Sequence, residues 1–370
     1  MDMREEVAIV ASATSRFTKS AHSIFELACQ PALKIFRESN IDRAEINAVI
    51  LSTCSELQYT SSIVSEMLGV RPNRSCRVDN LCNSGSLAIT SAFSEIAAGL
   101  SDCALVIGVE IRSNSSARKL EWDLTRGLFN HPIHWASLFA RSHMRKFGTT
   151  EEQMALVTVK NRINSSKNPL ALFRKKLTLE EIMRSQKLSE PIKVLDSSFI
   201  CSGSSAVLLA SKDKAKIFTD NPVWIKGIGQ NTTCASLSQL LREHDGGFTS
   251  TQQAARQAYT MSQKRPQDID VAELHDAFTI TEIMAYEDLF FTEKGQGGKF
   301  VTQDHLSVNP RGGLLGCGHP IGCTGVAQVS EIAEQLAGRA GGTQVKGCRT
   351  GLVHNMAAAG TSSTVLILGC

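Results

Sequence analysis

The sequence predicts an α/β protein made of two similar halves, and three observations support this prediction. Short apolar runs rich in β-branched residues alternate along the 370 residues with longer segments of helical periodicity. Many of the runs are apolar at nearly every position, which is typical of strands covered by helices on both faces. The segments 32–49 and 255–272 share the same order of helix, polar turn and strand, so we expect a duplicated unit rather than an array of short repeats.

The predicted strands follow this duplication in chain order. In the first half they are 7–11, 48–52, 75–78, 104–109 and 206–210, and in the second half 223–228, 270–274, 351–354 and 364–368. The likeness extends to two helices, because SEIAAGL from Ser94 and SEIAEQL from Ser330 stand in equivalent places near their ends. We divide the chain into an N-terminal half, 1–215, and a C-terminal half, 216–370.

A polar, basic stretch at about 113–197 has no counterpart in the second half. Prolines interrupt it, and its helical patterns cover 135–147, 151–164 and 179–185. An insertion of this length between two strands often forms a lid or a ligand-binding subdomain. Its basic residues, such as those at 174–176, are otherwise explained as a solvated surface.

Composition excludes several classes of protein. Lysine and arginine number 39 and aspartate and glutamate 36, a net charge of +3 without a basic stripe, so we expect no nucleic-acid partner. The sequence has no apolar run as long as a membrane span and no signal-peptide pattern at its start, so we expect no membrane and a cytoplasmic location. Eleven cysteines without CxxC pairs favour neither a disulfide framework nor a structural metal.

Cys82 is the first candidate for chemistry. It stands in the segment 78–86 (VDNLCNSGS), after a predicted strand and at the start of an apolar helix. A thiol at a helix N-terminus lies near unpaired N–H groups and the positive end of the helix dipole, which favours the thiolate. The small residues Ser84, Gly85 and Ser86 allow another backbone or a substrate to approach. A buried free cysteine with no chemical role is the plain alternative.

Three further segments carry histidines beside strands or glycines. His275 and Asp276 follow a strand of the second half, where side chains face the ligand crevice, and Asp276 is also a candidate cap for the following helix. Six glycines in 309–325 (NPRGGLLGCGHPIGCTG) imply a tightly turned backbone that aims His319. In 351–360 (GLVHNMAAAG), His354 precedes small residues that leave backbone N–H groups accessible for an oxyanion.

Together these segments resemble the thiolase superfamily. Residues 82–84 match the nucleophile motif CxS, and 318–320 match GHP. Residues 275–278 (HDAF) stand where many thiolases have NEAF and the sterol-carrier-protein type has HDCF. The resemblance covers essentially the whole chain, and the HDxF and HN forms place it nearest the sterol-carrier type and the archaeal acetoacetyl-CoA thiolases. It implies five layers, helix, sheet, helix, sheet and helix, with an insertion that contributes to coenzyme A binding.

The resemblance also implies roles for individual residues. Cys82 takes an acyl group from a CoA thioester, and His319 removes its thiol proton. His275 and His319 bind the thioester oxygen as an enolate forms. The backbone N–H of Cys82 and one from the turn that holds Ala359 and Gly360 form a second oxyanion hole. Such chemistry suits a dry, preorganised site.

One departure from the family concerns the second catalytic cysteine. The CxG motif near the C-terminus is replaced by HNMA at 354–357, and the cysteine of HDCF is replaced by Ala277. His275 and His354 are candidates for the missing proton transfer, whereas Cys317, Cys323 and Cys348 match no motif. If none of them serves, the protein binds and transfers acyl groups without efficient condensation.

The implied activity is that of an acetyl-CoA C-acetyltransferase, which interconverts two acetyl-CoA with acetoacetyl-CoA and CoA, without a metal or redox cofactor. Longer 3-ketoacyl-CoA substrates, a ketoacyl synthase using an acyl carrier protein, and a non-catalytic acyl-CoA scaffold remain alternatives. A cysteine hydrolase with Cys82, His319 and Asp276 as a triad is another. The family further implies a homodimer or tetramer, and archaeal relatives imply a complex with hydroxymethylglutaryl-CoA synthase through an OB-fold, zinc-ribbon protein.

Overall fold

The computed structural model describes residues 5–39, 41–112, 129–243 and 245–370. Within these residues one large mixed sheet runs in the order β10-β9-β11-β12-β8-β1-β7-β4-β2-β3. Its first-half strands are β1 (Val7–Thr14), β2 (Ala48–Ser52), β3 (Arg74–Val78), β4 (Cys103–Glu110) and β7 (Gly203–Ser211). Its second-half strands are β8 (Val223–Thr232), β9 (Val271–Glu273), β10 (Ser307–Val308), β11 (Thr350–Ala357) and β12 (Ser362–Gly369).

Helices complete both halves. In the first half they are α1 (Ile24–Glu38), α2 (Thr60–Leu68), α3 (Ser84–Ala97) and α7 (Lys212–Phe218). In the second half they are α8 (Leu237–Glu243), α9 (Thr249–Ser262), α10 (Thr279–Asp288), α11 (Gly297–Phe300), α12 (Gly313–Cys317) and α13 (Thr324–Leu336). Among the described residues, no helix has both the length and the apolar character needed to cross a bilayer.

The sheet confirms the predicted duplication. The order β3-β2-β4-β7-β1 is repeated as β10-β9-β11-β12-β8. In each half two pairs are parallel, β2 with β3 and β4, then β9 with β10 and β11, and the remaining pairs are antiparallel. Helices α1 and α9 precede β2 and β9, each through a short 3-10 turn. The particular division at residues 215 and 216 stays a prediction.

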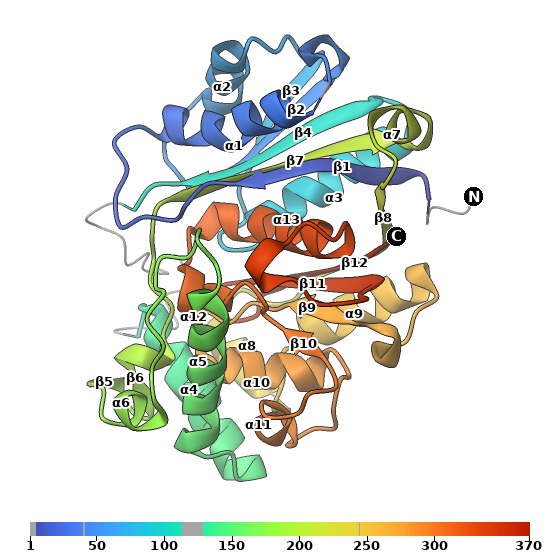
Figure 1. Cartoon of the computed structure of the whole chain (residues 1–370). Coiled ribbons are helices and arrows are strands. Elements are labelled where there is room, and N and C mark those ends of the chain that lie inside the picture. The colour runs from blue at the N-terminus through green and yellow to red at the C-terminus, as the bar shows by residue number, and fades with distance from the viewer. Residues whose placement is uncertain (1–4, 40, 113–128, 244) are drawn as a thin grey trace.

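The predicted five layers are present, with α3 and α13 between the two halves of the sheet (Figure 1). Alternate residues of each strand face opposite layers, as the period of two requires. On β1, Val7 and Ile9 face α3 and α13, whereas Ala8 packs with the outer helices α1, α2 and α7. On β12, Leu366 faces the centre and Val365 the other outer layer. Strands β1 and β12 are therefore apolar on both faces.

The two halves of the sheet also meet at one edge, which the sequence did not predict. Strands β1 and β8 pair antiparallel over two residues each, Ala8 with Trp224 and Ile9 with Val223. This short contact makes the sheet continuous while its two halves lie on opposite sides of α3 and α13.

The predicted insertion leaves the first half between β4 and β7. It contains α4 (Pro132–Phe147), α5 (Glu151–Ser166), α6 (Leu179–Met183) and a hairpin of β5 (Lys187–Ser189) and β6 (Ile192–Lys193). The three predicted helices are confirmed, and the part of the insertion at 113–128 lies outside the described residues. β5, β6 and β10 went unpredicted, because two or three residues are too few to display alternation.

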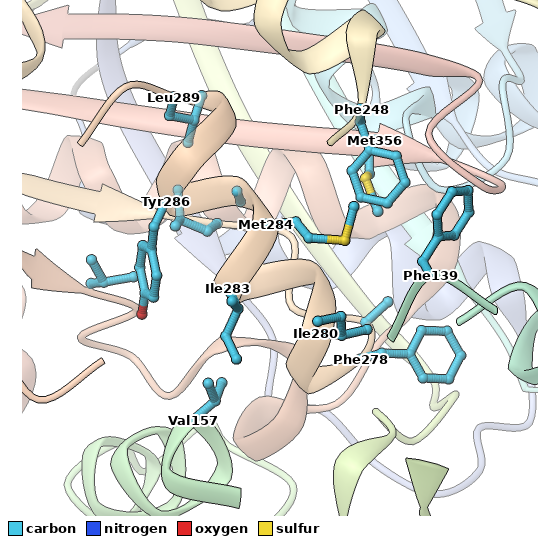
Figure 2. Packing of buried hydrophobic residues seen from close by; sticks show 14 of the residues in the cluster. Phe139, Val157, Phe248, Phe278, Ile280, Ile283, Met284, Tyr286, Leu289 and Met356 are labelled. Atoms are coloured by element: carbon cyan, nitrogen blue, oxygen red, sulfur yellow. The ribbon is translucent and has the colours of Figure 1, made fainter. Parts of the chain in front are cut away.

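The insertion packs on the second half through α10, a helix that is buried on every side. Figure 2 shows Val157 of α5 below Ile283, and Phe139 of α4 near Phe248, Phe278 and Met356. Carboxylates on α10 fix the same contact, since Glu287 lies 3.1 Å from His143 of α4 and Glu282 lies 2.6 Å from Lys160 of α5. The insertion thus packs firmly against the second half and does not form a separate subdomain.

Glycines bring the N-termini of α3 and α13 into direct contact, as the small residues after Cys82 predicted. A Cβ atom on Gly85 would lie 2.6 Å from the backbone nitrogen of Val326, and one on Gly325 would lie 2.3 Å from that of Ser86. Both distances are impossible for a real side chain. Only glycine permits this approach of the two helices.

We expect Gly85→Ala to lower the free energy of unfolding by about 1–3 kcal/mol, because the added methyl forces the two helices apart. The measurement is urea denaturation followed by circular dichroism. Ser94→Ala, on the exposed side of the same helix, is the matched control and should leave the midpoint nearly unchanged. Equal midpoints for Gly85→Ala and the control would contradict the close contact.

Candidate active site

Cys82 lies in a compact loop between β3 and α3, two residues before the first helical residue, Ser84. The hydroxyl of Ser84 accepts a hydrogen bond from the Asn80 N–H at 2.6 Å and donates to the Leu81 carbonyl at 2.6 Å. Leu81 has a left-handed backbone, with φ of 49°. These constraints place the partly exposed thiol at the N-terminus of α3, as predicted.

His319 faces that thiol from the glycine-rich segment. Its Nε2 lies 3.2 Å from Cys82 Sγ, and its Nδ1 lies 2.8 Å from the hydroxyl of Thr324. Its backbone N–H donates to the Phe199 carbonyl at 2.8 Å, which pins the loop to the end of the insertion. Burial lowers the pKa of His319 to about 3, so the ring is neutral at physiological pH. With the proton on Nδ1, the Nε2 lone pair is available to the thiol.

His275 completes the group. It follows β9, is 2% exposed, and its ring meets that of His319 edge to face with centroids 5.2 Å apart. Its Nδ1 lies 3.1 Å from the side-chain nitrogen of Asn355. Burial, followed by the neighbouring histidines, holds the pKa of His275 well below its usual value. The fold therefore brings together Cys82, His275 and His319, whose donor atoms all lie within 4.8 Å of one another.

Sulfur and two imidazole nitrogens are also a donor set that suits zinc. A tetrahedral zinc ion would bring such donors to about 3.5 Å from one another. The observed spread of up to 4.8 Å is wider, so ion binding would require the three side chains to close in. The present geometry suits proton transfer between Cys82 and His319 more directly.

The three side chains open into a cavity of about 250 Å³ with mostly apolar walls. The cavity is lined by Leu81, Cys82, His131, Pro132, Ile133, Trp135, Leu188, Ser197, Ser198, Ile200, His275, Ala277, Phe278, His319, Ile321 and Ala358. Several of these residues come from the insertion, which thus supplies one side of the cavity. An apolar wall excludes water and strengthens each electrostatic interaction at the reacting atoms.

Other candidate residues lie apart from these lining residues. His354 is fully buried on β11, its Nε2 lies 3.1 Å from the Thr251 hydroxyl, and burial lowers its pKa to about 3. In the turn after β11, Ala358 lines the cavity, whereas Ala359 is packed in the core and the Gly360 N–H donates to the Ala357 carbonyl. The proposed roles of His354, Ala359 and Gly360 stay predictions.

The additional cysteines are likewise separate from the cavity-lining residues. The thiol of Cys317 donates to the Arg311 carbonyl at 3.0 Å, and that of Cys348 donates to the Gln335 carbonyl at 3.3 Å. Cys323 is fully buried. Burial raises the pKa of Cys317 to about 12, so its thiol stays protonated.

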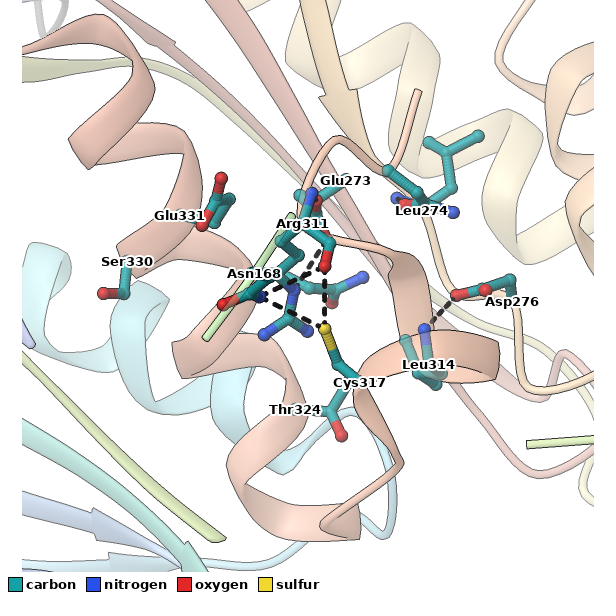
Figure 3. Close-up of polar contacts among 12 residues, drawn as sticks. Asn168, Glu273, Leu274, Asp276, Arg311, Leu314, Cys317, Thr324, Ser330 and Glu331 are labelled. Carbon is teal, nitrogen blue, oxygen red and sulfur yellow. Dashed lines mark hydrogen bonds and ion pairs between the residues drawn. The ribbon is translucent and has the colours of Figure 1, made fainter. Parts of the chain in front are cut away.

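Asp276 caps a helix, but a different one from the helix expected. Its carboxylate accepts from the backbone N–H groups of Leu314 and Leu315 at 2.7 and 3.1 Å, at the N-terminus of α12 (Figure 3). Burial and the nearby Glu282 raise its pKa to about 7. Because Nδ1 of His319 faces Thr324 instead, the hydrolase triad of Cys82, His319 and Asp276 is wrong.

Figure 3 also shows how the strand before His275 holds the loop before His319. Arg311 lies 2.9 Å from Glu273 of β9 in a buried ion pair, and its carbonyl accepts from Asn168 of the insertion at 3.1 Å. Asp276 fixes the next turn of the same segment. Both histidines are thereby held by one rigid block of structure.

Sequence reasoning missed Thr324, Asn355 and Gln328, which contact the histidines or one another. Thr324 stands inside the glycine-rich segment already singled out, and Asn355 adjoins His354. A polar residue in an otherwise apolar strand or helix start is the signal that would have pointed to them.

Comparisons with known proteins show the family to which the chain belongs. The family model for the thiolase N-terminal domain matches residues 7–213, and the model for the thiolase C-terminal domain-like region matches 232–370. Acetyl-CoA acetyltransferase of Methanothermobacter thermautotrophicus is 34% identical, over 98% of this chain and 99% of that protein. Sterol carrier protein 2 of Bos taurus is 30% identical, over 97% of this chain and 71% of that protein.

Among solved structures, one described as "Ltp2-ChsH2(DUF35) aldolase" has a TM-score of 0.88 at 24% identity and covers 100% of this chain and 99% of that chain. That likeness concerns the fold.

A duplicated five-layered fold with a thiol beside a neutral imidazole defines the class of acyl-transfer enzymes that work through a thioester. The chain belongs to the thiolase family and is an acyltransferase.

We expect Thr324→Val to slow alkylation of Cys82 by iodoacetamide about fivefold to tenfold, because one hydrogen bond no longer holds the His319 ring. Peptide mass spectrometry measures the rate at Cys82 alone. Thr324→Ser keeps the hydroxyl and should react nearly as fast as wild type. Equal rates for the valine and serine variants would show that this hydroxyl does not position His319.

Proposed function

We propose that the protein is an acetyl-CoA C-acetyltransferase, which interconverts two acetyl-CoA with acetoacetyl-CoA and CoA. The 3.2 Å contact between Cys82 Sγ and His319 Nε2 carries this proposal, because it supplies a nucleophile with its base. The archaeal relative named acetyl-CoA acetyltransferase, similar over its whole length, supports the choice of substrate.

The neutral state of His319 determines how the thiol is activated. A neutral imidazole accepts the thiol proton as the sulfur attacks the acyl carbonyl, so no buried ion pair is needed beforehand. The oxygen that becomes negative in this attack requires N–H donors. The backbone of Cys82 and the turn around Ala358 stand at the cavity and are the proposed donors.

A longer 3-ketoacyl-CoA is the second candidate substrate, and the cavity itself favours it. Ile133, Trp135, Leu188 and Phe278 form an apolar wall. Its volume of about 250 Å³ exceeds what a two-carbon acyl group fills. A longer apolar chain would gain about 25 cal/mol for each Å² that it buries there.

We also propose that the protein forms a dimer and binds a partner chain. β3 ends the sheet, and its residues Arg74, Ser75 and Cys76 are exposed, which supports a dimer that continues the sheet across a twofold axis. The structural neighbour named together with ChsH2(DUF35) supports a partner chain. We propose that this partner is an OB-fold, zinc-ribbon protein that links the enzyme to hydroxymethylglutaryl-CoA synthase in the cytoplasm.

The experiment is thiolysis of acetoacetyl-CoA by free CoA, followed through acetyl-CoA formation. We expect Cys82→Ala to lower the rate at least about 1,000-fold, because the acyl group loses its carrier. Cys370→Ala, at an exposed thiol near the C-terminus, is the matched control and should retain wild-type activity. Undiminished activity of Cys82→Ala would contradict the proposal.

The same assay with 3-oxooctanoyl-CoA separates the two substrates. A higher kcat/KM for acetoacetyl-CoA supports the leading proposal, and a higher value for the longer substrate favours the second candidate. A wild-type protein that binds both thioesters and cleaves neither would be a non-catalytic scaffold.

A further inference from the structure

We propose that Gln328 and Asn355 are positioning residues that hold His275 permanently as a hydrogen-bond donor, so that His319 alone moves protons in the reaction. This inference rests on the proposed function, since it assigns the proton transfers of that reaction. Asn355 stands in the segment 354–357, where the family's second catalytic cysteine is missing.

The chain of hydrogen bonds starts at a group whose direction is certain. The side-chain nitrogen of Gln328 donates to the carbonyl oxygen of His354 at 3.2 Å, and a carbonyl can only accept. The opposite atom of that amide, Oε1, is therefore an acceptor. It lies 2.8 Å from Nδ2 of Asn355, which fixes Asn355 with its nitrogen toward Gln328.

The second hydrogen of the same Asn355 nitrogen then points at His275. Nδ2 of Asn355 lies 3.1 Å from Nδ1 of His275, and an amide nitrogen cannot accept. Nδ1 must therefore carry the lone pair, and the single proton of the neutral ring must be on Nε2. Turning the Asn355 amide over would set two oxygens against each other at Gln328. The arrangement therefore persists, although Oδ1 of Asn355 is buried and has no hydrogen-bond partner among the described residues.

Burial makes this arrangement rigid. Gln328 and Asn355 are fully buried and His275 is 2% exposed, so water does not compete for these bonds. Protonation of His275 on Nδ1 would put two N–H groups face to face. The His275 ring therefore presents a fixed Nε2–H to the cavity. It has no lone pair on that nitrogen and so cannot act as a base there.

The reaction balances with His319 as its only base. In thiolysis, His319 takes the Cys82 proton while Sγ bonds to the 3-oxo carbon. The bond between carbons 2 and 3 breaks, its electron pair forms the enolate of acetyl-CoA, and Nε2–H of His275 donates to the enolate oxygen. His319 then returns the proton to carbon 2. In the second half, His319 takes the proton of the incoming CoA thiol, CoA sulfur displaces Sγ from the acyl carbon, and the proton passes to Cys82.

Asn355→Asp tests the inference through its pH dependence. An ionised carboxylate accepts where Asn355 donates, which draws the His275 proton to Nδ1 and removes the donor from the cavity. We expect thiolysis to fall on the order of 100-fold at pH 8, the usual effect of losing one oxyanion donor. Adding a proton to the pair formed by the new carboxylate and His275 restores Nε2–H of His275. The ratio of variant to wild-type kcat should therefore rise as the pH is lowered to 6.

Two control variants separate this effect from simple damage. Asn355→Leu removes the donor without adding a titratable group, so its loss should not vary with pH. Thr364→Val alters the residue paired opposite Asn355 on β12 and should follow the wild-type profile, because the Thr364 hydroxyl has no hydrogen-bond partner in the part of the chain that the structure describes. A ratio for Asn355→Asp that stays constant with pH would overturn the inference.

The ¹⁵N NMR spectrum of histidine-labelled wild-type protein reports the tautomer of His275 directly and needs no activity measurement. We expect the His275 signals, assigned by their loss in His275→Gln, to report a neutral ring protonated on Nε2. A proton on Nδ1 would overturn the inference. Because no substrate is present, this result is independent of whether acetoacetyl-CoA is cleaved, which is the test of the proposed function.

Discussion

The contact between the N-termini of α3 and α13 is the constraint on which the active site depends. Each helix follows one of the two side chains proposed to react, since Cys82 lies two residues ahead of α3 and His319 lies ahead of α13 across a short 3-10 turn. Because Gly85 and Gly325 let the two backbones touch, Sγ and Nε2 reach 3.2 Å from opposite halves of a duplicated chain. The duplication thus creates the site, since each half contributes the equivalent end of its central helix.

Burial sets the chemical state of this site. It keeps both imidazoles neutral, which suits His319 as a base and His275 as a donor. The buried charged groups around the site are paired or hydrogen-bonded. Arg311 pairs with Glu273, and Asn161 donates to both Asp276 and Glu282 at 2.7 and 2.8 Å. Removing one member of a buried ion pair commonly costs about 3–5 kcal/mol, so these networks hold the catalytic loops rigidly.

Much of this architecture could be predicted from the sequence. Short runs rich in apolar and β-branched residues predicted nine strands, because burial on both faces leaves a strong compositional signal in most of them. The repeated segments revealed the duplication. Cys82, His275 and His319 stood out through helix ends and glycines. The pairing of β1 with β8 and the cap that Asp276 makes on α12 could not be predicted from the sequence. The same holds for the hydrogen bonds of Thr324, Gln328 and Asn355. Such contacts join residues distant in the chain, and only the packed fold decides them.

The most direct test of the proposed reaction is to trap the acyl-enzyme. The protein is mixed briefly with acetoacetyl-CoA without free CoA, quenched in acid, digested and analysed by mass spectrometry at each of its eleven cysteines. We expect one acetyl group on Cys82, and its disappearance when CoA is added before the quench. Acetyl-CoA formation with no acyl group on Cys82, or with the group on another cysteine, would contradict it.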